Sequence, residues 1–506
     1  RAYHWRGMMR VPTYYQDLFD IIGENKGHVI GSTACLGSAP AQQLLKYQET
    51  GDEELYGQIC MWLLQMKELF GKGNFYLEIQ PSKTKEQVYV NKAMVELSES
   101  LQIPMICTTD SHYLTKDDRK VHKAFLTAQQ GEREVDAFYA TTYMMDTKEI
   151  SSFLEPQIGH EQLQKCFVNI QSIVDRAQDY ELAKPLRIPY LPKKVIEPNK
   201  ELIKKYANLI PLTHDFMNSK WSSDKDLVGV IFQRLEEEPE EFQRAEVYEE
   251  INSNLESLKL SSEALDTPWS AYLLNVRDYV STIWEEGNSL VGCGRGSSGG
   301  FFLNYLLEIT QVNPFRENTR MYSWRFLNPE RVSPLDVDLD TESSKRPQII
   351  RAFENHYGKD RVSRIITFRP EKAKSAIQTA CRGLGLDSDV GLYLSSFVSA
   401  DRGIQHSLDQ TYYGDPENNI SANQEFRKLM SEYSDVWEIA KKIEGLISGC
   451  GSHAGGIIFV DEPFHKTTAL MKTNSGDVIT QFDLDGCEEV GLIKIDALSI
   501  DGLDRI

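Results

Sequence analysis

The sequence lacks the patterns that mark several large classes of protein. Its eight cysteines are scattered, none forms a CxxC pair and no zinc-binding spacing occurs, so free buried thiols are expected rather than a disulfide or zinc scaffold. No apolar run reaches the ~18 residues that a membrane span needs. The longest candidates, Gly299–Leu307 and Ala454–Val460, are far shorter. Internal repeats and low-complexity tracts are also absent from the sequence.

Positive charge is scarce over the chain as a whole. The 506 residues carry 55 Lys and Arg against 75 Asp and Glu, a net charge of −20, which by itself disfavours a protein coated with nucleic acid. The charge is segregated, however, because Glu236–Glu263 is strongly acidic and Lys345–Lys374 is rich in Lys and Arg. A local phosphate-binding surface is therefore compatible with the acidic total. With 41% hydrophobic and 26% charged residues, disordered and collagen-like chains are excluded.

The length of 506 residues predicts roughly three or four domains. The order of periodic segments predicts a multidomain α/β and α+β protein. Residues 1–190 alternate strands and helices. The elements predicted there are helices over Asp52–Phe70 and Glu86–Leu101 and strands over Asn74–Ile79 and Ile103–Thr108. Prolines at 185, 189, 192 and 198 then indicate a linker.

Beyond the linker, the pattern predicts one mixed domain that is interrupted by a helical insertion. Residues 199–290 and 345–450 are predicted to be mainly helical. Residues 292–340 and 452–506 combine strands with short helices.

A glycine-rich turn, Gly292-Cys-Gly-Arg-Gly-Ser-Ser-Gly-Gly300, precedes the apolar run Phe301–Leu307. Glycines let backbone N–H groups approach a phosphate, and a helix N-terminus behind them would add a favourable dipole. Arg295, Ser297 and Ser298 add donors. The turn is equally compatible with a plain flexible connection, because a glycine cluster alone is a weak signal.

Three aspartates alternate with apolar residues in Leu335-Asp-Val-Asp-Leu-Asp340. On a strand, this alternation places Asp336, Asp338 and Asp340 on one face. Like charges on one face repel unless a cation lies between them, and Mg²⁺ prefers carboxylate oxygens. A solvated edge strand is the alternative, but three carboxylates in register favour a metal site.

A later segment, Gly491–Asp496, places Lys494 and Asp496 on one face of a predicted strand. Alone, it is typical of an ordinary half-buried strand. Combined with the glycine-serine turn and the alternating aspartates, it predicts nucleotidyl transfer. Two Mg²⁺ ions roughly 3.5–4 Å apart would clamp the displacement, one lowering the pKa of an attacking hydroxyl and the other holding the triphosphate.

The same residues resemble the alpha subunit of the bacterial and phage replicative DNA polymerase III, the C-family DNA polymerases. The resemblance covers most of residues 270–506, and RFLNPERVS followed closely by DxD is its most specific part. The matching runs are GRGS at Gly294–Ser297, RFLNPERVS at Arg325–Ser333, DVDLD at Asp336–Asp340, YGKDRVSRIITF at Tyr357–Phe368, HAGG at His453–Gly456, TQFD at Thr480–Asp483 and LIKID at Leu492–Asp496.

The resemblance implies a palm with the polymerase-beta-like nucleotidyltransferase fold over residues 191–367 and 452–506. It implies that Asp336, Asp338 and Asp496 are catalytic and bind two Mg²⁺ ions. A helical thumb would occupy residues 368–451. The implied nucleotide-binding residues are Gly294, Arg295, Gly296, Ser297, Ser298, Arg325 and Lys494. The implied DNA-binding residues are Arg361, Arg364, Lys372 and Lys374.

Residues 1–190 resemble the later part of the family's PHP domain, a phosphoesterase-like α/β barrel. The matching runs are TACLGS at Thr33–Ser38, FYLEIQ at Phe75–Gln80 and TTDSHYL at Thr108–Leu114. Asp110 and His112 match a metal-ligand pair, which Glu78 could join. From these residues alone, a ligand pair and a strand-end turn are equally compatible. The early PHP strands with their HxH ligands do not appear before Arg1, so a partial PHP domain is expected.

The expected partners are primer-template DNA, dNTPs, and a sliding clamp and replisome subunits that would bind through segments outside these 506 residues. The sequence starts at Arg1 without a basic-then-apolar leader, so no signal peptide is expected. A cytoplasmic location is expected, in a bacterium or a phage-infected bacterium. Ser452 stands where the family usually has Lys before HAGG, which would remove one phosphate or DNA contact. The alternatives are a PHP-type metal-dependent phosphoesterase and a non-catalytic replisome scaffold.

Overall fold

The computed structural model describes residues 3–5, 8–10, 14–130, 138–192, 196–315, 321–330, 334–473 and 476–506. The last three residues of the RFLNPERVS run, Arg331–Ser333, lie outside the described residues. Within the described part, no helix combines the length and the apolar character that crossing a membrane requires.

The chain divides into two compact units, each assembled from segments that are distant in sequence. The first, which we call the sheet unit, comprises Arg1–Val11, Glu181–Arg369 and Gly449–Ile506. The second unit comprises Pro12–Tyr180 and Pro370–Ser448. Both combine helices with strands, in agreement with the mixed α/β and α+β class predicted from the sequence.

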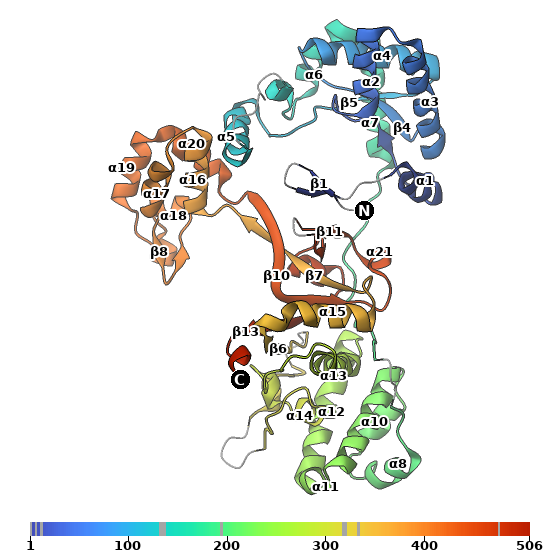
Figure 1. Cartoon of the computed structure of the whole chain (residues 1–506), viewed down its shortest axis with the longest axis vertical. Coiled ribbons are helices and arrows are strands. Elements are labelled where there is room, and N and C mark those ends of the chain that lie inside the picture. The colour runs from blue at the N-terminus through green and yellow to red at the C-terminus, as the bar shows by residue number, and fades with distance from the viewer. Residues whose placement is uncertain are drawn as a thin grey trace. The chain divides into compact units, whose positions relative to one another are not determined.

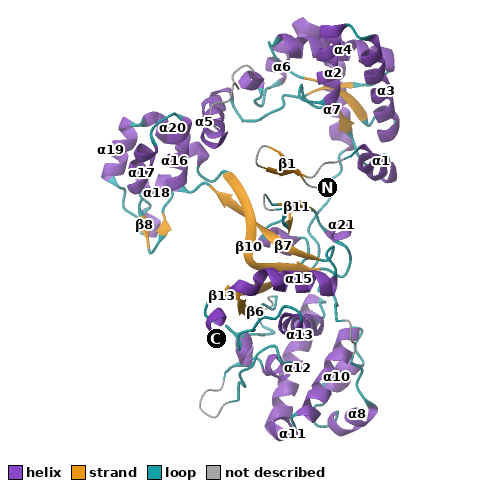
Figure 2. Cartoon of the chain, in the orientation of Figure 1, coloured by secondary structure: helices purple, strands orange, loops and turns teal. Residues whose placement is uncertain are grey.

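A mixed sheet forms the centre of the sheet unit, and six of its strands are described, in the order β11-β12-β7-β10-β13-β6 (Figures 1 and 2). These strands are β6 (Asp338–Glu342), β7 (Val362–Pro370), β10 (Ile447–Phe459), β11 (Leu470–Lys472), β12 (Val478–Thr480) and β13 (Lys494–Ile500). β13 runs parallel to β6 and antiparallel to β10. The last strand in sequence therefore lies between strands from two earlier segments.

The nine-residue strand β7 corrects the prediction that residues 345–450 are mainly helical. It occupies a central position in the sheet, between β12 and β10. Val362, Ile365 and Ile366 are buried in it, and such β-branched residues pack well on a pleated surface. The arginine and serine between them concealed the strand pattern in the sequence.

The two faces of the sheet differ in what covers them. Leu339, Ile457 and Ile495 face a large core that also contains residues of α13 (Trp269–Glu285) and α15 (Arg346–Tyr357). The opposite face contributes Ile365 and Ile458 to a smaller core. Because side chains alternate along a strand, the aspartates next to Leu339 and Ile495 project from the face of the smaller core.

Figure 2 shows α10, α12, α13 and α15 on one side of the sheet, and all four contribute buried residues to the large core. The remaining helices and strands of the unit are β1 (Tyr3–Trp5), β2 (Met8–Arg10), α8 (Lys200–Tyr206), α9 (Thr213–Met217), α10 (Ser222–Glu237), α11 (Pro239–Phe242), α12 (Ala245–Leu265), η3 (Ser298–Gly300), α14 (Phe302–Leu306), η4 (Ser323–Arg325), η5 (Ser343–Lys345), α21 (Phe464–Thr467), α22 (Leu484–Glu489) and η7 (Leu503–Arg505).

The first segment of the second unit contains a parallel sheet with the described strands β3 (Gly31–Ser32), β4 (Phe75–Ile79) and β5 (Met105–Cys107). The predicted strands and helices of this segment are confirmed within two residues at each end. Its helices are α1 (Tyr15–Glu24), α2 (Ala39–Thr50), α3 (Glu53–Phe70), α4 (Lys85–Leu101), η1 (Lys116–Asp118), α5 (Arg119–Gln130), η2 (Phe138–Thr141), α6 (Thr147–Ile158) and α7 (His160–Arg176).

The second segment of this unit is mainly helical and has a core of its own, to which Val121 and Ala124 of α5 also contribute. Gly383 touches α5 so closely that a Cβ there would lie 2.3 Å from the Ala124 carbonyl oxygen. The elements of the segment are α16 (Ala373–Gly383), α17 (Ser388–Ser396), β8 (Ala400–Asp401), β9 (Ile404–Gln405), α18 (Leu408–Tyr413), η6 (Pro416–Asn418), α19 (Gln424–Glu432) and α20 (Ser434–Ile443).

The proline-rich segment predicted as a linker is bound along the sheet unit over residues 184–191, which we call the strap. Backbone N–H groups of Lys184 and Arg187 donate to the carbonyls of Glu489 and Gly491, each at 2.9 Å. Further along, Asn275 donates to the Pro189 carbonyl at 2.6 Å. The strap is therefore tied to the loop that leads into β13.

Candidate metal and nucleotide site

Three aspartates come together where β6 and β13 lie side by side. In the parallel register of these strands Asp496 is paired with Asp338, and Asp336 precedes Asp338 by two positions. One carboxylate oxygen of each residue lies within 4.8 Å of the others. The predicted alternation is confirmed, since the intervening Val337 and Leu339 are buried. We call Asp336, Asp338 and Asp496 the acidic triad.

Lys494 projects from the same face of β13 as Asp496. Its Nζ donates to Asp496 Oδ2 and lies 3.3 and 3.4 Å from the two carboxylate oxygens of Asp336. Burial would lower the pKa of this ammonium group, but the hydrogen bond to Asp496 and the charges of Asp336 and Asp496 outweigh burial and raise the pKa. Lys494 therefore stays protonated and offsets part of the repulsion within the triad.

The electrostatics of the triad favour an additional cation. Burial, followed by the charges of Asp336 and Asp496, raises the pKa of the Asp338 carboxyl, although Arg295 and Lys494 oppose the shift. Asp496 Oδ1 is buried and has no hydrogen-bond partner among the described residues. A divalent cation that takes oxygen ligands would relieve both the repulsion and the unpaired oxygen, so the donor set fits Mg²⁺.

The glycine-rich turn is attached directly to β6. The Gly292 N–H donates to the Asp340 carbonyl at 2.9 Å, and a Cβ on Gly292 would lie only 2.8 Å from the Cβ of Asp340. Arg295 reaches back from the turn, with its Nη1 3.1 Å from Asp340 Oδ1 and its Nε 3.5 Å from Asp338 Oδ2. The guanidinium of Arg295 thus contacts both Asp338 of the triad and Asp340, the next outward-facing residue of β6.

Within the turn, Gly294 and Gly296 have φ values of 133° and 60°, which glycine adopts without strain. The buried Ser298 hydroxyl donates to the Arg295 carbonyl at 2.6 Å and so closes the turn in this conformation. Ser297 is half-buried. Backbone N–H groups and the Arg295 side chain are therefore the more accessible donors of this segment.

The helix after the turn is short: α14 spans Phe302–Leu306 and follows the 3-10 turn η3. Arg325, which the resemblance assigned to nucleotide binding, ends the 3-10 turn η4 and is exposed. Among the described residues, no ion pair joins Arg325 to the acidic triad. Its role stays a prediction.

The sequence analysis assigned no contact with the triad to two features that lie beside it. The buried Tyr272 hydroxyl accepts a hydrogen bond of 2.9 Å from the Val337 N–H, between Asp336 and Asp338. Gly456 is paired with Asp496, and neighbouring Gly455 lies so close that a Cβ there would be 3.4 Å from Asp496 Oδ1. Tyr272 gave no signal because it lies among the apolar residues of α13, whereas the glycines belonged to the quoted HAGG run.

The predicted ligands of the second unit lie near the ends of β4 and β5. Glu78 accepts from Ser32 at 2.6 Å, from Thr108 at 2.5 Å and from Gln80 at 3.0 Å, so neutral donors already hold this carboxylate. Asp110 has a φ of 46°, and its buried Oδ2 has no hydrogen-bond partner among the residues that the structure describes.

His112 Nδ1 lies 2.6 Å from the Asp110 carbonyl oxygen. Among the described residues, the acidic triad is the one group of three potential ligands that comes within 4.8 Å. A metal bound by Asp110 and His112 therefore stays a prediction.

The four residues predicted to contact DNA divide between the two units. Arg361 donates to the Asp461 carbonyl at 2.7 Å, and Arg364 forms an ion pair of 2.5 Å with Asp477. Both arginines therefore have partners within the sheet unit. Lys372 is exposed and Lys374 half-buried at the start of α16 in the second unit. Their contact with DNA stays a prediction.

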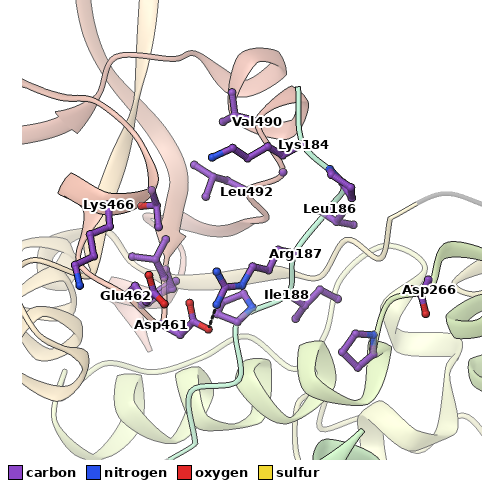
Figure 3. A pocket seen from close by; sticks show the side chains of 17 residues that line it. Lys184, Leu186, Arg187, Ile188, Asp266, Asp461, Glu462, Lys466, Val490 and Leu492 are labelled. Carbon is purple, nitrogen blue, oxygen red and sulfur yellow. Dashed lines mark hydrogen bonds and ion pairs between the residues drawn. The ribbon is translucent and has the colours of Figure 1, made fainter. Parts of the chain in front are cut away.

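A pocket of about 490 Å³ is lined by the strap together with residues 459–462 and 490–492 (Figure 3). Arg187 Nη2 forms an ion pair of 2.7 Å with Asp461 in this pocket (Figure 3). None of the triad residues lines it, so this pocket is separate from the acidic site.

Comparison with known proteins identifies the family to which the chain belongs. The model of the family described as "Bacterial DNA polymerase III alpha NTPase domain" matches residues 225–499. The chain is 37% identical over 517 residues to the DNA-directed DNA polymerase of Bacillus phage SPbeta, covering 99% of this chain and 39% of that protein. It is 27% identical over 528 residues to DNA polymerase III subunit alpha of Aquifex aeolicus, covering 99% and 42%.

A third relative, DNA polymerase III subunit alpha of Bacillus subtilis (strain 168), is 27% identical over 452 residues, covering 89% of this chain and 36% of that protein. The chain belongs to the family of the bacterial DNA polymerase III alpha subunit. It spans about two-fifths of the length of the relatives it matches.

Proposed function

We propose that this protein is a DNA-directed DNA polymerase of DNA replication, which transfers a nucleotide from a dNTP to a primer 3′-hydroxyl. The observation that carries the proposal is the acidic triad on neighbouring strands beside the glycine-serine turn. Pyrophosphate leaves as the 3′-oxygen attacks the α-phosphate. Carboxylates and oriented donors at one place suit this reaction, because its catalysis depends on positioning and charge stabilisation.

Asp336, Asp338 and Asp496 would hold the Mg²⁺ ions. Bound Mg²⁺ would lower the pKa of the attacking hydroxyl and neutralise charge on the phosphates. The triad's own contribution is its fixed spacing, since the paired register of β6 and β13 holds Asp338 beside Asp496. Lys494 restrains the Asp496 carboxylate through one oxygen, and the other oxygen has no hydrogen-bond partner within the described ranges.

The nucleotide would lie against the glycine-rich turn. Backbone N–H groups around Gly294 and Gly296, the Ser297 hydroxyl and the Arg295 guanidinium would bind the triphosphate. Arg295 pairs with Asp338 and Asp340 without ligand and would exchange part of this pairing for phosphate oxygens. Ser298 would maintain the turn, and Arg325 and Lys494 would add positive charge.

We further propose the domain roles that the family resemblance implies. Residues 1–190 would form a partial PHP domain, 191–367 and 452–506 the palm, and 368–451 the thumb. DNA contacts are assigned to Arg361, Arg364, Lys372 and Lys374. The partners would be primer-template DNA and, through other parts of the full-length protein, a sliding clamp and replisome subunits, in the cytoplasm of a bacterium or phage-infected bacterium.

Primer extension by the full-length protein with Mg²⁺ and dNTPs tests the proposal. Asp338→Asn preserves side-chain volume and removes one negative ligand, so extension should fall by at least ~10³-fold. Asp501→Asn is the matched control, because Asp501 is exposed just after β13. It should extend like the wild type.

Extension that persists in Asp338→Asn would refute the assignment of the triad. Hydrolysis of a phosphoester that requires Asp110 and ignores Asp338 would instead assign the activity to the PHP region. Unchanged DNA binding without extension by the wild type would favour a scaffold.

A further inference from the structure

We propose that His453 is a positioning residue, which holds a bend of β10 against the Asp496 carboxylate and thereby keeps one oxygen of Asp496 available for a cation. This inference rests on the proposed function, because its consequence for activity is measured as nucleotide transfer. Within the part of the chain that the structure describes, the His453 side chain forms no hydrogen bond or ion pair with the triad, and we infer that it acts through the backbone of Gly455 and Gly456.

The His453 ring accepts two hydrogen bonds at one atom. The backbone N–H groups of Gly455 and Gly456 both donate to Nδ1, at 3.1 and 2.7 Å. Successive N–H groups of an extended strand point to opposite sides, so their convergence on one nitrogen requires a bend in β10. A ring nitrogen that accepts carries no proton, which places the proton of the neutral imidazole on Nε2.

The bend occurs where β10 meets the triad. The antiparallel register of β10 and β13 pairs Gly456 with Asp496. The N–H of Gly456 donates to the His453 ring, and Asp496 is the residue opposite Gly456 on the neighbouring strand. At this register position the His453 ring accepts the hydrogen bonds of the β10 backbone N–H groups.

A side chain at either glycine would have to displace its neighbours. A Cβ on Gly455 would lie 2.7 Å from Leu498 Cδ2 and 3.4 Å from Asp496 Oδ1. A Cβ on Gly456 would lie 2.8 Å from Ile365 Cδ1 and 3.0 Å from His453 Nδ1. The bent backbone is thus in contact with the side chains around Asp496, and a displacement of the bend would change the space available to that carboxylate.

Asp496 is consequently held from two sides. Lys494 binds Oδ2, while Oδ1 is buried beside Gly455 and finds no hydrogen-bond partner in the described part of the chain. If the bend relaxed, a freed N–H of Gly455 or Gly456 could turn toward Oδ1 and compete with a cation for it. His453 prevents this competition by accepting both N–H groups. This role differs from that of an ordinary core histidine, which would affect stability alone.

Three substitutions separate the acceptor at Nδ1 from the rest of the ring. His453→Asn keeps an acceptor oxygen near the position of Nδ1, whereas His453→Gln places its acceptor near the position of Nε2 and His453→Ala removes it. In full-length protein, the Gln and Ala variants should lose about 10- to 100-fold in kcat, as is typical when a group that orients a metal ligand is removed. KM for dNTP should stay within about twofold, since nucleotide contacts are unchanged. The Asn variant should retain most activity.

The Mg²⁺ concentration for half-maximal extension should rise in the Gln and Ala variants and not in the Asn variant. His465→Ala is the matched control, since His465 is an exposed histidine of the same unit and should behave like the wild type. Equal loss in the Asn and Gln variants, no loss in any variant, or a rise in KM with unchanged kcat would each overturn the proposal.

Failure of the proposed function would be recognised separately, because neither the wild type nor Asp338→Asn would then extend a primer. In that case Mn²⁺ binding, measured by electron paramagnetic resonance, replaces extension as the readout. Weaker Mn²⁺ binding in the Ala and Gln variants than in the Asn variant would support the positioning role. Equal affinity in all three would overturn it.

Discussion

Replacing Asp338 by asparagine should stabilise the metal-free protein, even though we expect the same change to remove most of the proposed nucleotide transfer. Two unit charges 4.8 Å apart repel by ~0.9 kcal/mol in water and ~3.5 kcal/mol at an effective dielectric constant of about 20. Asp338 has two such neighbours within that distance and is opposed by Arg295 at 3.5 Å and by Lys494. Its side chain is 34% exposed, so solvent screening reduces the sum, and we expect a net gain of about 1 kcal/mol in the free energy of unfolding.

The pH dependence follows from the raised pKa of Asp338. Because the folded state binds this proton more tightly than the unfolded state, the free energy of unfolding falls as pH rises from the unfolded pKa of ~3.9 through the raised folded pKa. Above both values the destabilisation is complete. The asparagine variant cannot titrate at this position, so its stability should fall less across the same pH window.

Thermal unfolding in EDTA measures the effect. A gain of 1 kcal/mol corresponds to a rise in Tm of about 2–4 °C for a unit of this size. Adding Mg²⁺ should then raise the Tm of the wild type more than that of Asp338→Asn, because only the wild type keeps all three carboxylates. A lower Tm of the variant in EDTA would refute the reasoning, since it would mean that the ion pair with Arg295 outweighs the repulsion.

Two further predictions concern Lys494 beside the triad and Gly491 beside the strap. Lys494→Met leaves Asp336 and Asp496 uncompensated, so Tm in EDTA should fall by roughly 2–4 °C and the stabilisation by Mg²⁺ should increase; an unchanged Tm would mean that Lys494 does not neutralise the site. Gly491→Ala should lower the free energy of unfolding by more than the ~1–2 kcal/mol that its φ of 81° alone would cost, because the new Cβ would lie 2.4 Å from the Pro185 carbonyl oxygen of the strap. Gly403→Ala is the control, because Gly403 has a similar φ of 82° but no described atom within 4 Å of an added Cβ. If chemical denaturation showed equal losses in the free energy of unfolding for the two variants, the strap would not be tightly packed.

The parts of the site that follow from local pattern were predictable. Alternation placed Asp336 and Asp338 on one face of an extended segment because side-chain direction along a strand depends only on the backbone. The glycines at 294 and 296 were also recognisable, because the ability to adopt a positive φ without strain depends on the residue type alone. The family motifs added the order of these pieces.

Other features depended on contacts between distant segments. The prolines at 185 and 189 indicated a break in regular structure, but the hydrogen bonds to residues 489 and 491 that make this segment a strap come from a part of the chain far away in sequence. β7 was missed because its arginines and serine break the apolar pattern. Its neighbours β12 and β10 supply the hydrogen bonds that keep it extended.

The sequence by itself determined which residues could carry charge toward one face and where the backbone could turn, because these are short-range properties of residue type and spacing. Tertiary structure alone decided that Asp496 is paired with Asp338, that Lys494 lies between Asp336 and Asp496, and that the bend at Gly455 lies against Asp496. These outcomes depend on the register of strands from separate segments. Register is set by the packing of the whole sheet against its cores, so no single segment specifies it.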